Sequence, residues 1–360
     1  MTTSPKPLAF IVDDVKENIQ VALSHLTNID CDFAYATSGE QAIERITLTN
    51  PQLILMDVVM PGMDGYQTVQ KLKANAATAK IPVIFLTAKN EPEDIAKGFE
   101  SGGVDYITKP FSGAELRARI ATWLELSSYR ENLENEVEER TSEIQLLKQV
   151  VIEAMGELAE FRDPETGAHI KRTQHYVKTL AEQLFSNSAF PQELDPEGIT
   201  LLYKSAPLHD IGKVGIPDSI LLKPGKLSPD EFTEMQNHTL YGQTVIRKLE
   251  KRVGKSSFLK YANDIIVGHH EKYDGSGYPY GLKEDEIPLA GKIMAIADVY
   301  DALTTRRVYK EAFPHEKVMA IMNEGNGSHF DPIVFNAFLE VEIDFRAIAA
   351  TYEDEELIFS

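Results

Sequence analysis

Short apolar runs alternate with segments of helical periodicity over the first third of the chain. Three of the runs are continuously apolar, which is typical of strands buried on both faces of a parallel sheet. The segments between them repeat apolar residues at helical spacing, as at Ala42, Ile43 and Ile46. Five such β-α units predict a doubly wound α/β domain of the (βα)5 type. The expected strands are Leu8–Val12, Asp32–Ala36, Leu53–Met56, Val83–Leu86 and Asp105–Thr108.

The pattern changes near residue 113, beyond which apolar residues step by alternating threes and fours. This heptad pattern has glutamates such as Glu131 and Glu138 outside its seam, and Arg130 and Arg140 interrupt it. One interpretation is an amphipathic helix that lies on its own domain. The other, which we favour, is a parallel coiled coil that dimerises the chain and links two domains. The seam positions are Trp123, Leu126, Arg130, Leu133, Val137, Arg140, Ile144, Leu147, Val151, Ala154 and Leu158.

Residues 151–345 show helical periodicity with few strand-like runs, so we expect an all-α domain there. Eight of the nine histidines lie in this half. The predicted organisation is therefore an α/β domain over residues 6–127, a coiled-coil linker helix over 128–150 and an all-α domain over 151–345. Residues 346–360 form an acidic tail.

Composition narrows the possible partners. A chain of 360 residues with a net charge of −20 is poorly suited to bind DNA or an anionic membrane, since both require basic patches. An anionic ligand would need local cations, most simply bound metals, to reverse the sign of the field. The single cysteine, Cys31, excludes a disulfide framework and a cysteine-based zinc site. The apolar runs are too short for a membrane span or a signal peptide, so we expect a cytoplasmic protein.

Charged and hydroxyl side chains stand at the ends of the expected strands, where the chemistry of a parallel sheet gathers. Asp13 and Asp14 end the first strand, Asp57 the third, Thr87 the fourth and Lys109 the fifth. Three carboxylates supply the hard oxygen ligands that Mg²⁺ prefers. A carboxylate beside Mg²⁺ can attack a phosphoryl group, because the metal and Lys109 neutralise the developing charge. Acidic strand ends often simply face solvent, but this combination favours a phosphorylation site.

This half resembles the receiver domain of two-component response regulators. The resemblance implies a flavodoxin-like fold, phosphorylation of Asp57 by a sensor histidine kinase, and Mg²⁺ bound by Asp13 or Asp14 together with Asp57. It also implies that Thr87 and Tyr106 are a switch pair that reorients after phosphorylation. The matching strings are Asp13-Asp14, Met56-Asp57-Val58-Val59-Met60-Pro61-Gly62-Met63-Asp64-Gly65, Thr87-Ala88 and Lys109-Pro110-Phe111.

Histidines and carboxylates recur at close spacing in the second half. Glu165 and His169 are four residues apart and so share one face of a helix. The pairs His209-Asp210 and His269-His270 project about 100° apart on a helix, so both members can bind only in a broad, multinuclear site. Imidazole and carboxylate ligands without thiolate suit Mn, Fe, Co, Ni or Zn. Two such metals can hold a hydroxide between them and clamp a phosphodiester for attack.

This half resembles the HD-GYP family of the HD phosphohydrolase superfamily, whose members hydrolyse cyclic di-GMP to the linear dinucleotide pGpG, and in some cases on to GMP. The matching strings are His209-Asp210-Ile-Gly-Lys213-Val-Gly-Ile-Pro217-Asp218, His269-His270-Glu271-Lys-Tyr-Asp274-Gly275-Ser-Gly277-Tyr278-Pro279 and Ile296-Ala-Asp298-Val-Tyr-Asp301-Ala-Leu-Thr-Thr. The resemblance implies two iron or manganese ions, with Asp210 as the bridging and catalytic ligand. Glu165 matches the extra carboxylate of members with three metals. The implied metal ligands are Glu165, His169, His209, Asp210, His238, His269, His270 and Asp298.

The resemblance also implies contacts with the substrate. Lys213 would meet the scissile phosphate, and Arg307 and Lys310 would bind the other phosphates of the dinucleotide. Tyr278 lies in a turn-rich loop that either only reverses the chain, or else stacks on a guanine or docks a partner protein; we leave these open. We interpret Gly327-Ser-His329-Phe-Asp331-Pro as the start of a helix rather than a ligand site.

Three functions remain. The leading hypothesis is a cyclic di-GMP phosphodiesterase, dimeric through the linker helix, whose metal site responds to phosphorylation of Asp57. The second is a catalytically weak sensor or scaffold that acts through partners such as diguanylate cyclases or other adaptor proteins. The third is an HD hydrolase of another nucleotide, against which the long string around Tyr278 argues.

Overall fold

The computed structural model describes residues 6–88, 92–161, 167–305 and 312–352. The chain divides into two compact units, Met1–Ser142 and Glu143–Ser360, called here the N-terminal and C-terminal units. Within the described ranges, no helix combines the length and the apolar character that crossing a membrane requires.

A parallel sheet of five strands forms the centre of the N-terminal unit, in the order β2-β1-β3-β4-β5. Strands β3 and β4 are buried along their whole length, because helices cover both faces of the sheet. The predicted doubly wound fold is therefore confirmed. The strands are β1 (Leu8–Val12), β2 (Asp32–Ala36), β3 (Leu53–Asp57), β4 (Val83–Thr87) and β5 (Asp105–Thr108).

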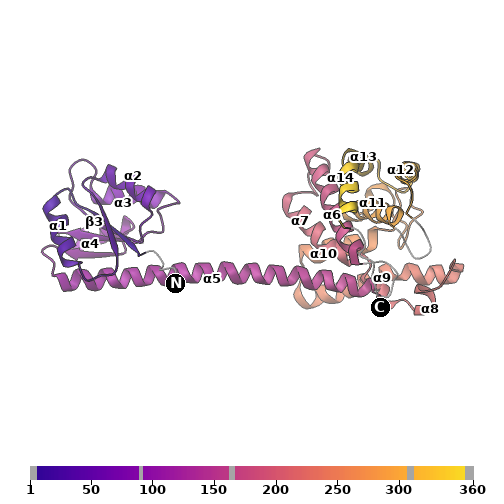
Figure 1. Ribbon diagram of the computed structural model, residues 1–360, viewed down its shortest axis with the longest axis horizontal. Helices are drawn as coiled ribbons and strands as arrows, with labels where there is room; N and C mark the ends of the chain where they lie inside the picture. Colours follow the sequence, from indigo (N-terminus) through magenta and orange to yellow (C-terminus); the bar gives the residue numbers. More distant parts are fainter. Residues whose placement is uncertain (1–5, 89–91, 162–166, 306–311, 353–360) are drawn as a thin grey trace. The chain divides into compact units, whose positions relative to one another are not determined.

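Helices pack on the two faces of this sheet (Figure 1). Ile46 and Leu72 bring α2 (Gly39–Thr49) and α3 (Gly65–Ala74) onto one face. Ile19 of α1 (Lys16–His25) and Ile120 of α5 pack on the other face. The remaining helix of the N-terminal unit is α4 (Pro92–Glu100), which precedes β5. This arrangement leaves the carboxyl ends of the strands open for chemistry.

A single helix, α5 (Gly113–Glu160), spans 48 residues and includes the whole of the predicted linker. Every residue from 128 to 148 is exposed, although Arg130 and Glu134 at the start of this stretch contact Lys80 of the N-terminal unit. Its apolar seam residues are exposed as well: Leu133 is 59% and Val137 is 63% exposed. An apolar seam in this state is typical of a helix that pairs with another helix.

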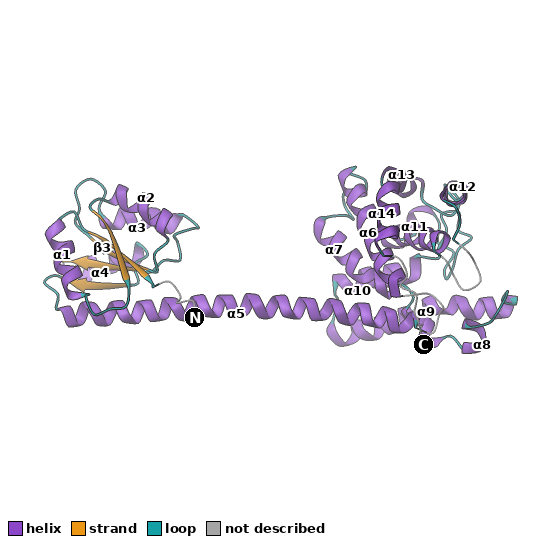
Figure 2. Cartoon of the chain, in the orientation of Figure 1, coloured by secondary structure: helices purple, strands orange, loops and turns teal. Residues whose placement is uncertain are grey.

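The described part of the C-terminal unit consists of helices and loops (Figure 2). Its largely aliphatic core contains an aromatic group, in which Tyr176 stacks on Phe345 with ring centroids 4.5 Å apart and Tyr300 packs at a steep angle to both rings. Beyond α5, its helices are α6 (Gly167–Ser186), α7 (Pro196–Ser205), η1 (Ala206–Leu208), η2 (Ile211–Gly215), α8 (Asp218–Leu221), α9 (Pro229–Val253), α10 (Ser257–Gly268), η3 (Glu284–Glu286), α11 (Leu289–Thr304), α12 (His315–Glu324), α13 (Pro332–Glu340) and α14 (Glu342–Thr351).

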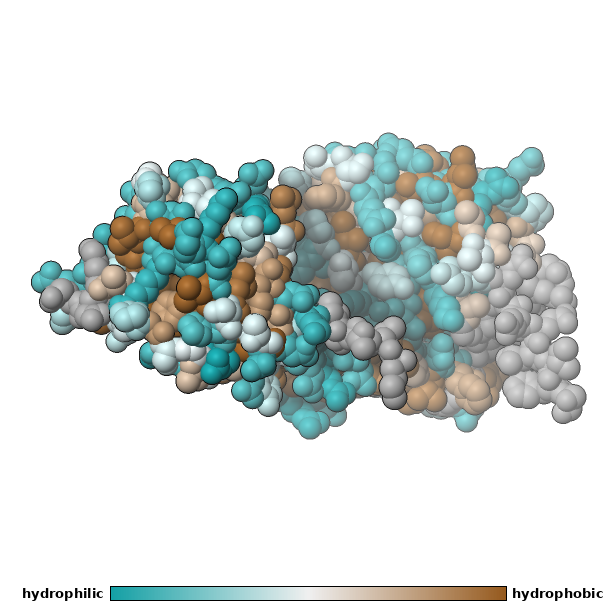
Figure 3. Space-filling view, turned by 60° about the vertical axis from the view of Figure 1, so that its left-hand side comes forward, coloured by the Kyte–Doolittle hydropathy of each residue, from teal (hydrophilic) through white to brown (hydrophobic). Residues whose placement is uncertain are grey.

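The surface is mixed in character. On the face drawn in Figure 3, hydrophilic residues are interspersed with smaller hydrophobic areas.

The interpretation of Gly327-Ser-His329-Phe-Asp331-Pro as a helix start is confirmed. Asp331 is the N-cap of α13, and its side chain accepts hydrogen bonds from the backbone amides of Ile333 and Val334.

Candidate functional sites

Three carboxylates and one ammonium converge at the carboxyl edge of the sheet. Asp13, Asp14 and Asp57 each offer an oxygen, and these oxygens lie within 4.8 Å of one another. The Lys109 Nζ atom donates to Asp13 Oδ2 and to Asp57 Oδ1, both at 2.7 Å. Burial lowers the pKa of Lys109, but these two hydrogen bonds outweigh it and raise the pKa. A permanent cation therefore faces Asp57, as phosphoryl transfer to that carboxylate requires.

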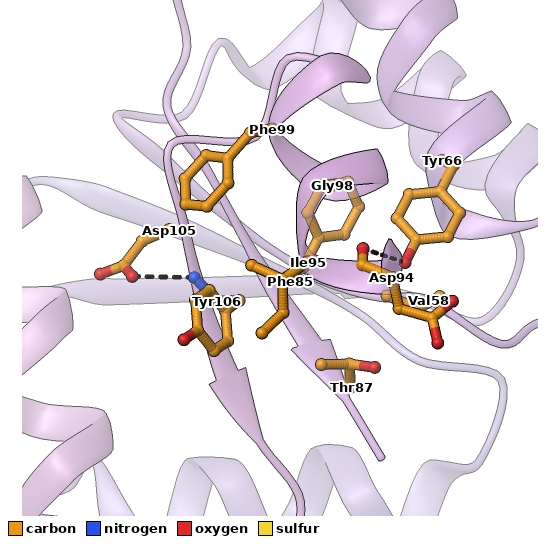
Figure 4. A pocket seen from close by; sticks show the side chains of 10 residues that line it. All are labelled: Val58, Tyr66, Phe85, Thr87, Asp94, Ile95, Gly98, Phe99, Asp105 and Tyr106. Atoms are coloured by element: carbon orange, nitrogen blue, oxygen red, sulfur yellow. Dashed lines mark hydrogen bonds between the residues drawn. The ribbon is translucent and has the colours of Figure 1, made fainter. Parts of the chain in front are cut away.

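The proposed switch residues flank this edge. Thr87 is buried at the end of β4, and Tyr106 follows on β5 (Figure 4). The ring of Tyr106 meets the edge of Phe99 from α4, with centroids 6.3 Å apart. Both residues line one small pocket between β4, β5 and α4.

A first histidine cluster in the C-terminal unit consists of Asp210, His238, His269 and His270. Each offers one ligand atom, and these atoms lie within 4.8 Å of one another. Asp210 Oδ1 lies 3.2 Å from His238 Nε2 and 3.6 Å from His269 Nε2. Gly212 allows this approach, because a Cβ atom there would collide with the backbone carbonyl of His238 on α9.

A second histidine cluster consists of Glu160, His169 and His209, all buried. The two Nε2 atoms of His169 and His209 face each other at 3.4 Å. Asp210 joins the clusters, because its Oδ2 atom lies 3.3 Å from His209 Nε2 while its Oδ1 atom faces the first cluster. Burial raises the pKa of Glu160 to about 7, against the effect of the neighbouring His169 and His209.

The donor atoms of both clusters fit metal ions. Several buried donor atoms have no hydrogen-bond partner, which is costly unless a cation occupies the space between them. In His209, His238 and His269 the Nδ1 atom on the opposite side of the ring donates to a backbone carbonyl, as His238 Nδ1 does to Met235 at 2.8 Å. That bond fixes the tautomer and leaves Nε2 free to coordinate. The unpartnered atoms are both Glu160 carboxylate oxygens, Asp210 Oδ1, His238 Nε2 and His269 Nε2.

Two further predicted residues border the clusters. Lys213 Nζ lies 2.8 Å from Asp210 Oδ2. Asp298 Oδ1 lies 4.0 Å from His169 Nε2, at the edge of the second cluster. Glu165, Arg307 and Lys310 lie outside the described residues. The structure thus brings seven of the eight predicted metal ligands to one place and does not describe the eighth, Glu165.

The sequence analysis assumed that the adjacent pairs His209-Asp210 and His269-His270 lie within regular helices, but they do not. His209 and Asp210 stand between the turns η1 and η2, and His269-His270 follow the last residue of α10. Pro207 has no amide hydrogen, so the helix that ends at Ser205 cannot continue through it.

Supporting side chains hold the clusters in place. Asp301 Oδ2 accepts from His169 Nδ1 at 2.8 Å, and Arg172 donates to both oxygens of Asp301. These bonds hold the pKa of Asp301 at about 2, although burial alone would raise it. The sequence analysis gave these residues no role, although Arg172 stands three residues after His169 and Asp301 three after Asp298, each on a shared helix face.

The loop after His270 is fixed by a buried carboxylate. Glu271 accepts from the backbone amides of Tyr280 and Leu282, at 2.7 and 3.0 Å. The Tyr278 ring stacks on His270, with centroids 4.7 Å apart. Tyr278 therefore packs against a candidate ligand, a position the sequence did not indicate.

Comparison with known proteins adds the family. The chain matches the model of the HD domain over residues 153–334 and that of the response regulator receiver domain over residues 9–121. It is 49% identical to a Vibrio cholerae protein named "Probable cyclic di-GMP phosphodiesterase", covering 96% of this chain and 80% of that protein. It is 35% identical to the "Cyclic di-GMP phosphodiesterase response regulator RpfG" of Xanthomonas campestris, covering 83% of this chain and 78% of that protein. A third relative, "3'3'-cGAMP-specific phosphodiesterase 2" of Vibrio cholerae, is 40% identical over 54% of this chain and 35% of its own length.

Proposed function

Because the chain belongs to the HD domain family and carries a response regulator receiver domain, we propose that it hydrolyses cyclic di-GMP under the control of phosphorylation at Asp57. Two relatives named as cyclic di-GMP phosphodiesterases support this, and one of them is also named a response regulator. The observation that carries the proposal is the position of Asp210, whose two oxygens face different histidine clusters. A carboxylate in that position can bridge the metals of a phosphodiester-cleaving site.

The proposed cofactors are two or three iron or manganese ions. The first histidine cluster would hold one ion and the second another, with Asp210 shared between them. Asp298 would complete the second cluster, and Glu165 remains the proposed carboxylate for a third ion. When bound, the ions would activate water near neutral pH and neutralise charge on the phosphate oxygens.

The side chains of the chain itself position the substrate. Lys213, whose Nζ atom lies 2.8 Å from Asp210 Oδ2, is proposed to contact the scissile phosphate. Arg307 and Lys310 are proposed to bind the phosphates of the dinucleotide. Tyr278, whose ring stacks on His270, is proposed as a further contact of the substrate. A cationic site of this kind holds an anionic substrate on a chain of net charge −20.

The N-terminal unit is proposed to receive the signal. Mg²⁺ at Asp13, Asp14 and Asp57 would assist transfer of a phosphoryl group from a sensor histidine kinase to Asp57. The exposed seam of α5 is proposed to pair with the same seam of a second copy and to carry the change onward.

The test is hydrolysis by anaerobically purified, metal-analysed protein. Cyclic di-GMP and 3'3'-cGAMP are supplied separately, before and after beryllofluoride treatment, and pGpG and GMP are separated by chromatography. We expect turnover of cyclic di-GMP, and a change in rate with beryllofluoride that the Asp57→Asn variant lacks. Absence of turnover in metal-loaded protein, with and without beryllofluoride, would refute the proposal.

A double variant, His209→Ala with Asp210→Ala, separates catalysis from scaffolding. If hydrolysis causes the biological effect, cells that carry the double variant lose it together with turnover. If they keep the full effect, the C-terminal unit acts as a sensor or scaffold, for example for a diguanylate cyclase or another adaptor protein.

A further inference from the structure

Glu160 is the last residue of α5, and its side chain is buried in the second histidine cluster. Glu160 Oε1 lies 3.6 Å from His169 Nε2 and 3.8 Å from His209 Nε2, and those two nitrogens are 3.4 Å apart. The three atoms form a nearly equilateral triangle. Its centre is about 2.1 Å from each corner, which matches the distance from a divalent transition metal to nitrogen and oxygen ligands.

The contacts of Glu160 do not fit a purely structural role. Glu160 is only 2% exposed, and neither of its carboxylate oxygens has a hydrogen-bond partner. Both distances to the imidazole nitrogens exceed those of hydrogen bonds. A buried carboxylate without partners is costly, whereas the same group beside a metal ion is neutralised.

We propose that Glu160 is a metal ligand of the second histidine cluster, so that the end of α5 is part of the metal centre. This inference rests on the proposed function, since it assigns a further ligand to the same centre. It does not depend on Glu165, which lies outside the described residues.

Local packing explains how a helix end reaches the cluster. A Cβ atom at Gly156 would stand 2.6 Å from the carbonyl oxygen of Pro207, two residues before His209. Glycine at this position therefore allows α5 to approach the turn that carries His209. Glu160 follows one helical turn later and lies on the same face.

With Glu160 as a ligand, α5 is anchored at both ends, in the core of the N-terminal unit and in the metal centre. Leu116 and Ile120, near its start, are buried in the core of the N-terminal unit, and Glu160 ends it in the metal centre. Rotation or fraying of the last turn of α5 would move a ligand directly. The receiver could thereby act on metal occupancy without a separate relay.

The experiment compares Glu160→Gln with Glu157→Gln in the full-length chain. Glu157 is exposed on the preceding turn and serves as the matched control. Each protein is reconstituted anaerobically with Mn²⁺ and dialysed, and metal per chain is measured by mass spectrometry. We expect Glu160→Gln to lose about one ion, or to bind its weakest ion at least ~10-fold less tightly. The Glu157→Gln protein should match the wild type.

Thermal unfolding with and without Mn²⁺ separates a ligand from a folding residue. Since Glu160→Gln replaces a buried carboxyl group that has no hydrogen-bond partner, the metal-free variant should be at least as stable as the metal-free wild type. Added Mn²⁺ should then raise the unfolding temperature less in the variant. Equal metal content and equal Mn²⁺-induced shifts would overturn the inference. Turnover of cyclic di-GMP by wild-type protein tests the proposed function separately, so the two failures are distinguishable.

Discussion

His269 and His270 are buried next to Asp210, and their surroundings set the protonation of the site. Burial lowers the pKa of His269, and burial together with His269 and His238 lowers that of His270 well below its ordinary value. Burial would raise the pKa of Asp210, but Lys213 and His209 hold it well below the usual range. Neutral imidazoles beside an ionised carboxylate are the forms that bind metal.

His329 provides a pH-dependent prediction away from the ligands. Its ring stacks on Phe330, and burial, aided by Lys272, lowers its pKa from 6.5 to about 4, against the opposing charges of Asp274 and Asp298. The folded histidine stays neutral at a pH where the unfolded one takes up a proton. The folded state therefore loses stability as pH falls from 6.5 towards 4, by about 1–2 kcal/mol at pH 5.

The measurement is the unfolding free energy of metal-free protein at pH 7 and pH 5, compared with His329→Gln. The variant cannot titrate, so its stability should fall less between the two values. Parallel losses in both proteins would show that His329 does not contribute.

Residue identity explains which site residues the sequence revealed. Histidine and aspartate in adjacent pairs are unusual outside metal sites, so His209-Asp210 and His269-His270 were evident. Glu160 was not, because glutamates are common along α5 and only tertiary packing distinguishes the buried one from exposed neighbours such as Glu157. Asp301 was missed because it holds the candidate ligand His169 and is not itself a predicted ligand.

At the level of elements, α5 shows what periodicity predicts and what it leaves open. The heptad predicted a helix, and its apolar residues have the expected spacing. The helix is longer than the predicted linker, because α5 already begins at Gly113 in the receiver unit and continues to Glu160. The pattern alone did not reveal that both ends are buried while the middle is exposed.

Replacement of Arg140 in the seam tests the proposed pairing of α5. A charged residue at a seam position is expected to weaken a dimer. Arg140→Leu should therefore tighten self-association at least ~10-fold, corresponding to about 1.4 kcal/mol. Sedimentation measures the dissociation constant, and Glu138→Leu, outside the seam, is the control for added hydrophobicity. Equal tightening by both variants would indicate nonspecific association.

At the scale of the whole molecule, the two folds were predictable because each half has its own periodicity. The short apolar runs are typical of buried strands, and the histidine-rich half has helical spacing with few strand-like runs. The connection between phosphorylation and hydrolysis is different, since it depends on how changes at Asp57 reach residues 143–160 of α5. The covalent path is this one helix, and its helical phase is therefore the property to test.

Insertions after Ser142 change that phase without touching either site. Seven added residues restore the heptad, whereas two added residues rotate the following seam by about 200°. We expect the seven-residue variant to keep the response to beryllofluoride and the two-residue variant to lose or invert it. Basal turnover by both should stay within about twofold of the wild type, because the histidine clusters lie wholly within the C-terminal unit. If both insertions respond as the wild type does, the helical phase of α5 does not carry the signal, and control must pass through another contact.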